Sequence, residues 1–318
     1  MTPFILRRLL QAVPTLLGIT VIAYAIVRLA PGDPLAVFED SRGITAEQVA
    51  ELRKAYGFER PLPVQYVEWL TRVVRLDFGR SFQTHLPARD LILERVPATL
   101  ELSLAALLIA LALGVPAGVW AATHRGGWPD QLVRVVAVVG DAVPHFWLGL
   151  IAIALLSVQL RWLPAGGILT LGASPFDLGD RLKHLLLPAL VLATSGLALF
   201  ARYVRAEVLD VLGQDFVRTA RAKGLHERVV LYGHALRNAL LPLVTAIGGS
   251  LPGLLAGAAT TEYVFSWPGM GRLAVDAAGA RDYPVVMGLV LVVAVLVIVG
   301  NLLSDVLYGV VDPRIRLS

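Results

Sequence analysis

The chain has 318 residues, of which 56% are hydrophobic and only 16% are charged, and its mean hydropathy is +0.69. A soluble chain is typically about 25% charged, so the long uncharged stretches indicate a protein dissolved in lipid rather than a pair of soluble domains. The formal net charge of +4 therefore does not indicate nucleic-acid binding, and the absence of cysteine excludes disulfides and thiolate metal sites.

Six segments are long and apolar enough to cross a bilayer. A hydrocarbon core of about 30 Å needs about 20 helical residues, and a helix pairs every backbone amide within the chain, which lipid cannot do. The expected spans are Leu9–Leu29, Thr99–Ala121, Leu132–Leu160, Leu185–Tyr203, Ala239–Thr261 and Val285–Tyr308. The sequence thus predicts an all-α, polytopic membrane protein with six transmembrane helices.

The first span is expected to be retained rather than cleaved as a signal peptide. Arg7 and Arg8 precede it, as in a signal peptide. Its apolar stretch of about 20 residues is longer than the usual 7–15, and no clear A-x-A cleavage site follows.

Residues 31–96 are expected to form a small external domain between the first two spans. Thr45-Ala46-Glu47-Gln48 fits a capping box at a helix start, and Gly57 suits the end of that helix. Pro63 to Leu76 reads as a second short helix, with apolar residues at helical spacing. Either this domain is a cap that packs on the spans, or it is a docking surface for a soluble partner.

The short loops predict the orientation, because cytoplasmic loops carry an excess of Lys and Arg. The loop from Arg202 to Arg237 holds seven Arg or Lys residues against four acids. Basic residues also precede the first span, connect spans two and three and end the chain; they are Arg7, Arg8, Arg125, Arg314 and Arg316. With six spans these regions share one side, so both termini are expected in the cytoplasm.

Catalytic motifs are missing from the sequence. A phosphate-binding loop needs a Gly-Lys-Ser/Thr run, and none of the three lysines, Lys54, Lys183 and Lys223, follows a glycine. The six histidines have no metal-ligand spacing, and no G-x-S-x-G elbow is present. We therefore expect no enzyme activity, no cofactor and no metal site.

The cytoplasmic loop 204–238 is the most informative stretch. Thr219 to Lys223 are good helix formers that end at Gly224, and Phe216, Thr219/Ala220 and Lys223 are expected to share one face. On the residues alone, two interpretations stand. The loop is either an ordinary basic loop or a short helical knob that seats in a groove of another protein.

The runs Thr219–Leu225 (TARAKGL) and His234–Pro242 (HALRNALLP) resemble the EAA loop of ATP-binding-cassette importer permeases, in the dipeptide/oligopeptide/nickel branch. The sequence departs from the general family pattern at Arg218, Thr219, His234 and Arg237, as the peptide branch does. Further similar stretches, in the family's order, are Pro31–Pro34, Arg95–Leu102, Glu262–Gly271, Arg281–Pro284 and Asp312–Arg316.

The resemblance implies a permease subunit of the type with the larger external loop. It divides the chain into residues 1–30 (N-terminus and first helix), 31–96 (external domain), 97–308 (permease core) and 309–318 (cytoplasmic tail). Its implied partners are a second permease subunit, two ATPase subunits that hydrolyse the ATP, an external solute-binding protein and a peptide-like solute. The implied location is the inner or plasma membrane of a bacterium or archaeon. The implied ATPase-coupling residues are Phe216, Thr219, Ala220, Arg221, Ala222, Lys223, Gly224, Leu225, His234 and Leu236.

Two features within the spans have alternative interpretations. Gly249, Gly253 and Gly257 lie on one helix face, where small residues let helices approach, either within the subunit or against the second permease. Asp141 and His145 either contribute polar groups to the translocation path or brace a kink at Pro144, since a charged group in lipid must be solvated or paired.

The alternative function is a stand-alone secondary transporter or channel. Such a protein would carry ion-coupling residues within its spans and often inverted repeats. Apart from Asp141 and a few polar groups near helix ends, the spans lack them. An intramembrane enzyme would depend on Asp141, but the residue two before Gly140 is Val138, where an intramembrane aspartyl protease has glycine.

Overall fold

A computed structural model describes residues 2–29, 46–55, 57–174, 176–240 and 242–311. Within these residues every regular element is helical, and the one pairing of extended backbone is an isolated bridge between Arg80 and Pro87. The helices are α1 Thr2–Leu29, α3 Ala46–Ala55, α4 Leu62–Val74, α5 Ala88–Thr123, α6 Trp128–Ala142, α7 His145–Ala152, α8 Leu178–Leu212, α9 Asp215–Ala222, α10 Glu227–Val229, α11 Leu236–Ala239, α12 Leu243–Val264, α13 Met270–Gly279 and α14 Tyr283–Val311, with π-helical stretches η1 Ile153–Gln159 and η2 Val230–Ala235. The predicted all-α class is confirmed.

Four of the described helices are each long and apolar enough to cross a membrane: Leu6–Leu29, Ala88–Thr123, Leu178–Leu212 and Tyr283–Val306. Two bent pairs bring the number to six if each pair counts as one span. These pairs are Trp128–Ala142 with His145–Gln159, and Glu227–Ala239 with Pro242–Leu254. The chain is thus a multi-span membrane protein.

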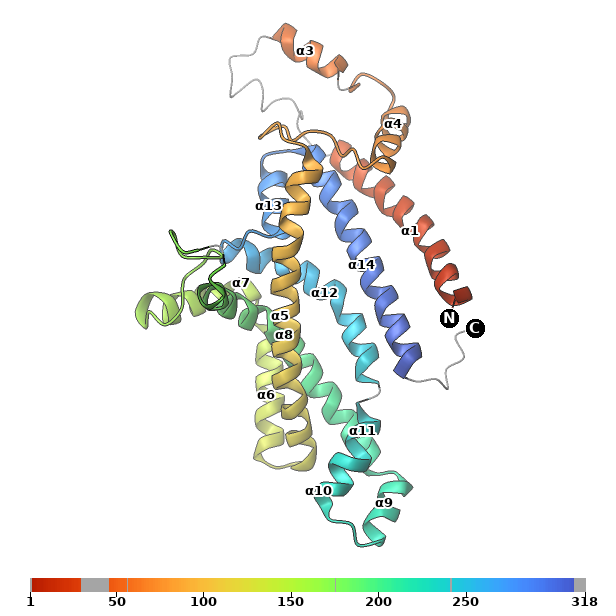
Figure 1. Cartoon of the computed structure of the whole chain (residues 1–318), viewed down its shortest axis with the longest axis vertical. Coiled ribbons are helices and arrows are strands. Elements are labelled where there is room, and N and C mark those ends of the chain that lie inside the picture. The colour runs from red at the N-terminus through yellow and green to blue at the C-terminus, as the bar shows by residue number, and fades with distance from the viewer. Residues whose placement is uncertain (1, 30–45, 56, 175, 241, 312–318) are drawn as a thin grey trace.

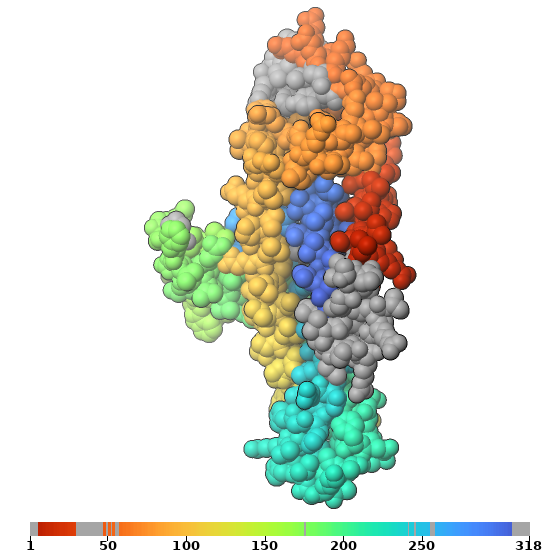
Figure 2. All heavy atoms as spheres, turned by 45° about the vertical axis from the view of Figure 1, so that its right-hand side comes forward, coloured from red at the N-terminus to blue at the C-terminus, as the bar shows by residue number. Residues whose placement is uncertain are grey.

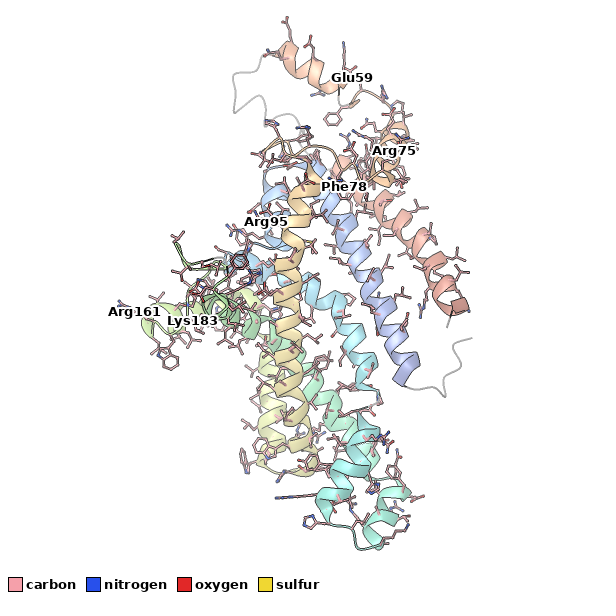
Figure 3. All side chains as sticks on the ribbon, viewed as in Figure 1. Glu59, Arg75, Phe78, Arg95, Arg161 and Lys183 are labelled. Carbon is pink, nitrogen blue, oxygen red and sulfur yellow. The ribbon has the colours of Figure 1, made fainter. Side chains whose placement is uncertain are left out.

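The predicted span Leu132–Leu160 is sharply bent at Pro144, the position where the sequence predicts a kink. Its two halves, α6 and the run from α7 through η1, meet at 102°. The cause is Pro144, because a proline disfavours helical geometry in the residue before it. Val143 is accordingly extended, with φ −83° and ψ 122°. The second half therefore forms an arm that leaves the helix bundle sideways, with Arg161 at its outer end (Figures 2 and 3).

The core of the bundle is the pair α5 and α8. Every fourth residue of α5 is buried from Leu102 to Ala122, and most of these residues are Ala or Gly. A Cβ on Gly118 would stand 2.6 Å from the carbonyl oxygen of Ala201, and one on Gly114 would stand 3.0 Å from that of Leu197. Small side chains thus let the two backbones approach closely, as is common between helices in lipid.

The described part of the external domain confirms the two short helices, which appear as α3 and α4. Gly57 has φ +71°, a conformation that glycine adopts without steric cost, and its amide donates to the carbonyl of Lys54 at 2.9 Å. Tyr66 and Trp69 of α4 pack on Tyr24 of α1, so α4 sits at the C-terminal end of the first span. The similar stretches at 31–34 and 312–316, and Thr45 of the capping box, lie outside the described residues.

The bundle is elongated, with different elements at its two ends (Figure 1). One end carries α3, α4 and α13, and the other carries α9, α10 and α11. α1 lies along α14 at one side, where the guanidinium of Arg8 pairs with Asp305 at 3.0 Å. The predicted coupling loop therefore stands at the opposite end from the predicted external domain.

Candidate functional site

The loop 204–238 forms a compact knob at one end of the molecule, built from α9, α10, η2 and α11 on the tip of α8 (Figures 1 and 2). α8 has 35 residues and is therefore about 52 Å long, well beyond a bilayer core of about 30 Å. Its surplus length holds the knob clear of the membrane-spanning part of the bundle.

One side of α9 packs against the rest of the knob. Val217 and Ala220, one turn apart, are buried against a cluster that includes Val211 of α8 and Val230 of η2. The helix ends at Gly224, which has φ +78°, and the guanidinium of Arg221 pairs with Glu227 at 2.6 Å. The expectation that Ala220 shares the outward face with Phe216 and Lys223 is wrong, because Ala220 belongs to the inner apolar stripe with Val217.

Most of the predicted coupling residues lie on the knob's exposed surface. Phe216 is 39% exposed and Leu225 is 40% exposed, which is high for large apolar side chains. The other exposed members of the set are Thr219, Arg221, Ala222, Lys223, Gly224 and His234. Leu236 is partly buried and packs against the same cluster as Ala220. The knob thus presents apolar and basic groups together on a rigid base.

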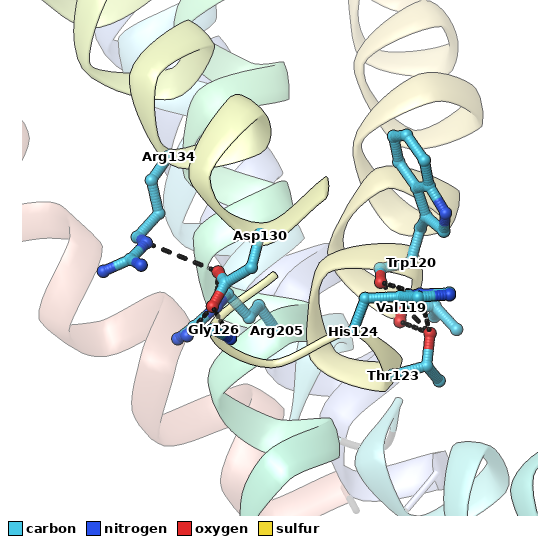
Figure 4. A network of polar contacts seen from close by, with 8 residues as sticks. All are labelled: Val119, Trp120, Thr123, His124, Gly126, Asp130, Arg134 and Arg205. Carbon is cyan, nitrogen blue, oxygen red and sulfur yellow. Dashed lines mark hydrogen bonds and ion pairs between the residues drawn. The ribbon is translucent and has the colours of Figure 1, made fainter. Parts of the chain in front are cut away.

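Asp130 anchors the turn between α5 and α6 to α8 (Figure 4). Its carboxylate is 1% exposed, accepts from Nε and Nη2 of Arg205 at 2.6 and 2.8 Å, and accepts the amide of Gly126 at 2.9 Å. Arg134 adds a longer contact at 3.4 Å. Sequence reasoning missed this cluster; an acid beside the first turn of a span, opposite a basic helix end, was the available signal.

Asp141 and His145 both contact α8. The carboxylate of Asp141 pairs with the guanidinium of Arg202 at 3.1 Å, and their side chains are 51% and 40% exposed. Nε2 of His145 lies 2.8 Å from the hydroxyl of Ser195. These contacts flank Pro144, so both side chains link α8 to the helix break, and the ion pair also lies open on the surface of the described chain.

The glycines of α12 differ in their surroundings. A Cβ on Gly249 or Gly253 would meet no described atom within 4 Å, so within the described chain these two glycines pack against nothing. The surroundings of Gly257 lie outside the described side chains. The close approach inside the subunit is instead at Gly248, where a Cβ would overlap the side chain of Ser304 on α14.

The run Glu262–Gly271 forms a buried hydrogen-bond network with α5. Glu262 is fully buried and accepts from the hydroxyl of Thr99 at 2.6 Å and from the amide of Arg272 at 3.0 Å. The same Thr99 hydroxyl accepts the amide of Met270 at 2.8 Å, and the indole of Trp267 donates to the carbonyl of Ala98 at 2.8 Å. Two of the stretches that carry the family resemblance, 95–102 and 262–271, therefore meet in space.

Arg281–Pro284 is joined to the external segment in the same manner. Asp282 is 3% exposed and accepts from the hydroxyl of Ser81 and from the amide of Phe82, the latter at 3.1 Å. Its carboxylate thus ties the start of α14 to the segment that leads into α5.

Comparisons with known proteins agree with this architecture. The family described as "Binding-protein-dependent transport system inner membrane component" matches residues 114–317, and its N-terminal companion family matches residues 1–104. The oligopeptide transport system permease protein AppB of Bacillus subtilis (strain 168) is 46% identical over 317 residues, covering 99% of this chain and 100% of that protein. The dipeptide transport system permease protein DppB of Escherichia coli (strain K12) is 43% identical, covering 99% of each chain.

Among solved structures, an inward-facing form of the MetNI methionine ABC transporter is similar in fold, with a TM-score of 0.57 and 20% identity over 70% of this chain and 96% of that chain. The family match and the full-length relatives, together with the knob on α8 and the buried contacts of its motifs, lead to one conclusion. The chain belongs to the family of binding-protein-dependent transport system inner membrane components.

Proposed function

We propose that this chain is one of two permease subunits of an ATP-driven importer for peptides or similar small solutes, and that it forms half of the translocation path. The observation that carries the proposal is the knob of residues 204–238, which stands clear of the spans on the surplus length of α8. Full-length similarity to permeases named for oligopeptide and dipeptide transport supports the class of solute.

The knob is the docking element for an ATPase subunit. Its exposed Phe216 and Leu225 offer an apolar anchor, and Lys223 adds a positive charge beside them. Val217 and Ala220 pack α9 directly against η2 and α8. A displacement of α9 by an ATPase subunit is therefore transmitted to α8 through packed side chains rather than through a flexible loop. Closure of two ATPases would thus move the ends of the spans and switch the pore between inward- and outward-facing forms.

The remaining partners follow from the two ends and one open face. With the knob in the cytoplasm, α3, α4 and α13 face outward, where an external binding protein delivers the solute. Both chain termini are then cytoplasmic, and the chain is a multi-pass protein of the bacterial or archaeal plasma membrane. Gly249 and Gly253, which have open space beside them, suit close packing against the second permease.

Asp141 and His145 contribute to the translocation path. α8 carries no charged residue between Lys183 and Arg202, and Ser195, the partner of His145, lies near the middle of that stretch. His145 therefore lies near the bilayer midplane, and Asp141, whose partner Arg202 is seven residues from Ser195 on α8, lies about 10 Å toward the knob. Since exposed charges at that depth are costly in lipid, the face that carries Asp141 is expected to meet water.

A test of the docking role is Phe216→Asp, with Phe216→Leu as the matched control. The aspartate places a charge in the apolar contact, so we expect ATPase subunits to dissociate and ATP-driven uptake to fall at least tenfold, whereas leucine keeps both. The measurement is co-purification of the ATPases and uptake by the reconstituted complex. Equal ATPase binding and uptake by the two variants would reject the docking role and favour a stand-alone transporter.

A further inference from the structure

Asp141 and Arg202 form an ion pair that differs from the other ion pair between α6 and α8 in the described part of the chain. Both side chains are about half exposed, at 51% and 40%. Arg202 is seven residues from Ser195 on α8, so the pair is expected about 10 Å from the bilayer midplane, inside the half-thickness of about 15 Å of the hydrocarbon core. By contrast, Asp130, which bonds Arg205 between the same two helices, is 1% exposed. The first pair is therefore presented to the space beside the bundle, while the acid of the second is enclosed.

We expect the space that the exposed pair faces to contain water rather than lipid. A charged group within the hydrocarbon core is costly in lipid, so such groups face a bundle interior or a water-filled cavity. Among the described residues, the carboxylate of Asp141 pairs with the side chain of Arg202, whose guanidinium also reaches the carbonyl of Ala137 at 3.5 Å. Each charge thus retains open sides that water or a passing solute can reach.

The pair carries no net charge. A lone carboxylate on the wall of a narrow wet path attracts cations and repels anions, and a lone guanidinium does the reverse. Because the charges are only 3.1 Å apart, their fields largely cancel for a solute about 12 Å away. The wall therefore treats cationic, neutral and anionic solutes alike.

We infer that the Asp141–Arg202 pair makes the translocation path indifferent to the charge of its solute, with Arg202 present to neutralise Asp141. A path for peptides must pass side chains of either sign, and this neutral pair provides that tolerance. The inference rests on the proposed function as a peptide importer, and Arg202 becomes a determinant of specificity that acts through its charge.

The experiment measures ATP-driven uptake of three tripeptides, Ala-Lys-Ala, Ala-Ala-Ala and Ala-Glu-Ala, by the reconstituted full complex. Each rate is divided by the wild-type rate for the same peptide, which removes selection by the binding protein. Arg202→Gln should raise the Lys/Glu uptake ratio about a hundredfold, because one charge about 12 Å away at an effective dielectric constant of about 20 changes the two rates by about tenfold each in opposite directions. Asp141→Asn should lower the ratio by about the same factor.

Two double variants separate charge from structure. Asp141→Asn with Arg202→Gln, and the exchange Asp141→Arg with Arg202→Asp, should each return the Lys/Glu ratio to within about twofold of wild type. Asp130→Asn is the matched control, because it breaks an enclosed pair between the same helices, and it should change uptake of all three peptides by one common factor.

Unchanged ratios in both single variants, with uptake still measurable, would overturn the inference. Equal ratio changes in Asp130→Asn would also overturn it, since the effect would then come from helix packing. The proposed function fails separately, if the wild-type complex takes up none of the three peptides in response to ATP.

Discussion

Thr99 shows how one small side chain holds two distant segments together. Its hydroxyl donates to Glu262 at 2.6 Å and accepts from the amide of Met270 at 2.8 Å. Glu262 is fully buried, so each of its hydrogen bonds replaces water that cannot reach it. The hydroxyl therefore satisfies a buried carboxyl group and the first amide of α13 together.

We predict that Thr99→Val lowers the free energy of unfolding by about 1–3 kcal/mol. The change keeps the shape but leaves the buried amide of Met270 without this acceptor and removes one of the hydrogen bonds of buried Glu262, and such a penalty exceeds the worth of the bond itself. Thr99→Ser, which retains the hydroxyl, should lose less. The measurement is thermal unfolding of the purified complex in nanodiscs, and a Thr99→Val midpoint equal to wild type would contradict the role given to Thr99.

The sequence predicts the chemical character of the site better than it predicts the directions in which its side chains point. The apolar and basic character of the knob, the stop at Gly224 and the polar pair Asp141 and His145 follow from local patterns. The inward direction of Ala220 does not, because it depends on where η2 packs, and η2 is a π-helical stretch that a 3.6-residue period does not describe. The partners Arg202 and Ser195 are 61 and 50 residues from theirs, beyond the reach of any local pattern.

At the scale of the elements, the close contact between α5 and α8 depends on glycines, which have no side chain. Gly118 faces the carbonyl of Ala201 and the side chain of Val204, which a Cβ would meet at 2.6 and 2.9 Å. Backbone atoms cannot turn aside as a flexible side chain can. The two helices would have to separate to accept even one methyl group.

We therefore predict that Gly118→Ala destabilises the subunit by about 1–3 kcal/mol, the usual cost of overpacking a close contact. Gly18→Ala on α1 is the matched control, because no described atom lies within 4 Å of its Cβ position. That change should be neutral or slightly stabilising, since alanine favours a helix over glycine. Thermal unfolding of both variants decides the point, and equal destabilisation would show that glycine at 118 is not needed for packing.

The limits of sequence reasoning at this scale are clear from two spans. The repeat of small residues every four positions on α5 is visible in the sequence and indicates this helix contact, as the glycine repeat on α12 indicates another. Pro144 was recognised as a kink, but a hydropathy average cannot say that the chain turns by 102° there. The bent half also packs α7 against α12, which lies about 100 residues further along the chain and is beyond any local pattern.

The whole molecule has a clear polarity, with the knob at one end and α3, α4 and α13 at the other (Figure 1). The mechanism needs the knob on the side where ATP is available, because the sequence itself carries no phosphate-binding loop. The positive-inside rule assigns the knob to the cytoplasm, since the loop from Arg202 to Arg237 is strongly basic. Orientation is thus the claim on which the coupling role depends.

The chain contains no cysteine, so a single introduced thiol reports its own side of the membrane. We predict that Lys223→Cys reacts with a membrane-impermeant maleimide in inverted vesicles but not in spheroplasts, while Glu59→Cys in the external domain shows the opposite pattern. Labelling of Lys223→Cys from outside intact spheroplasts would place the knob away from any ATPase and contradict the account.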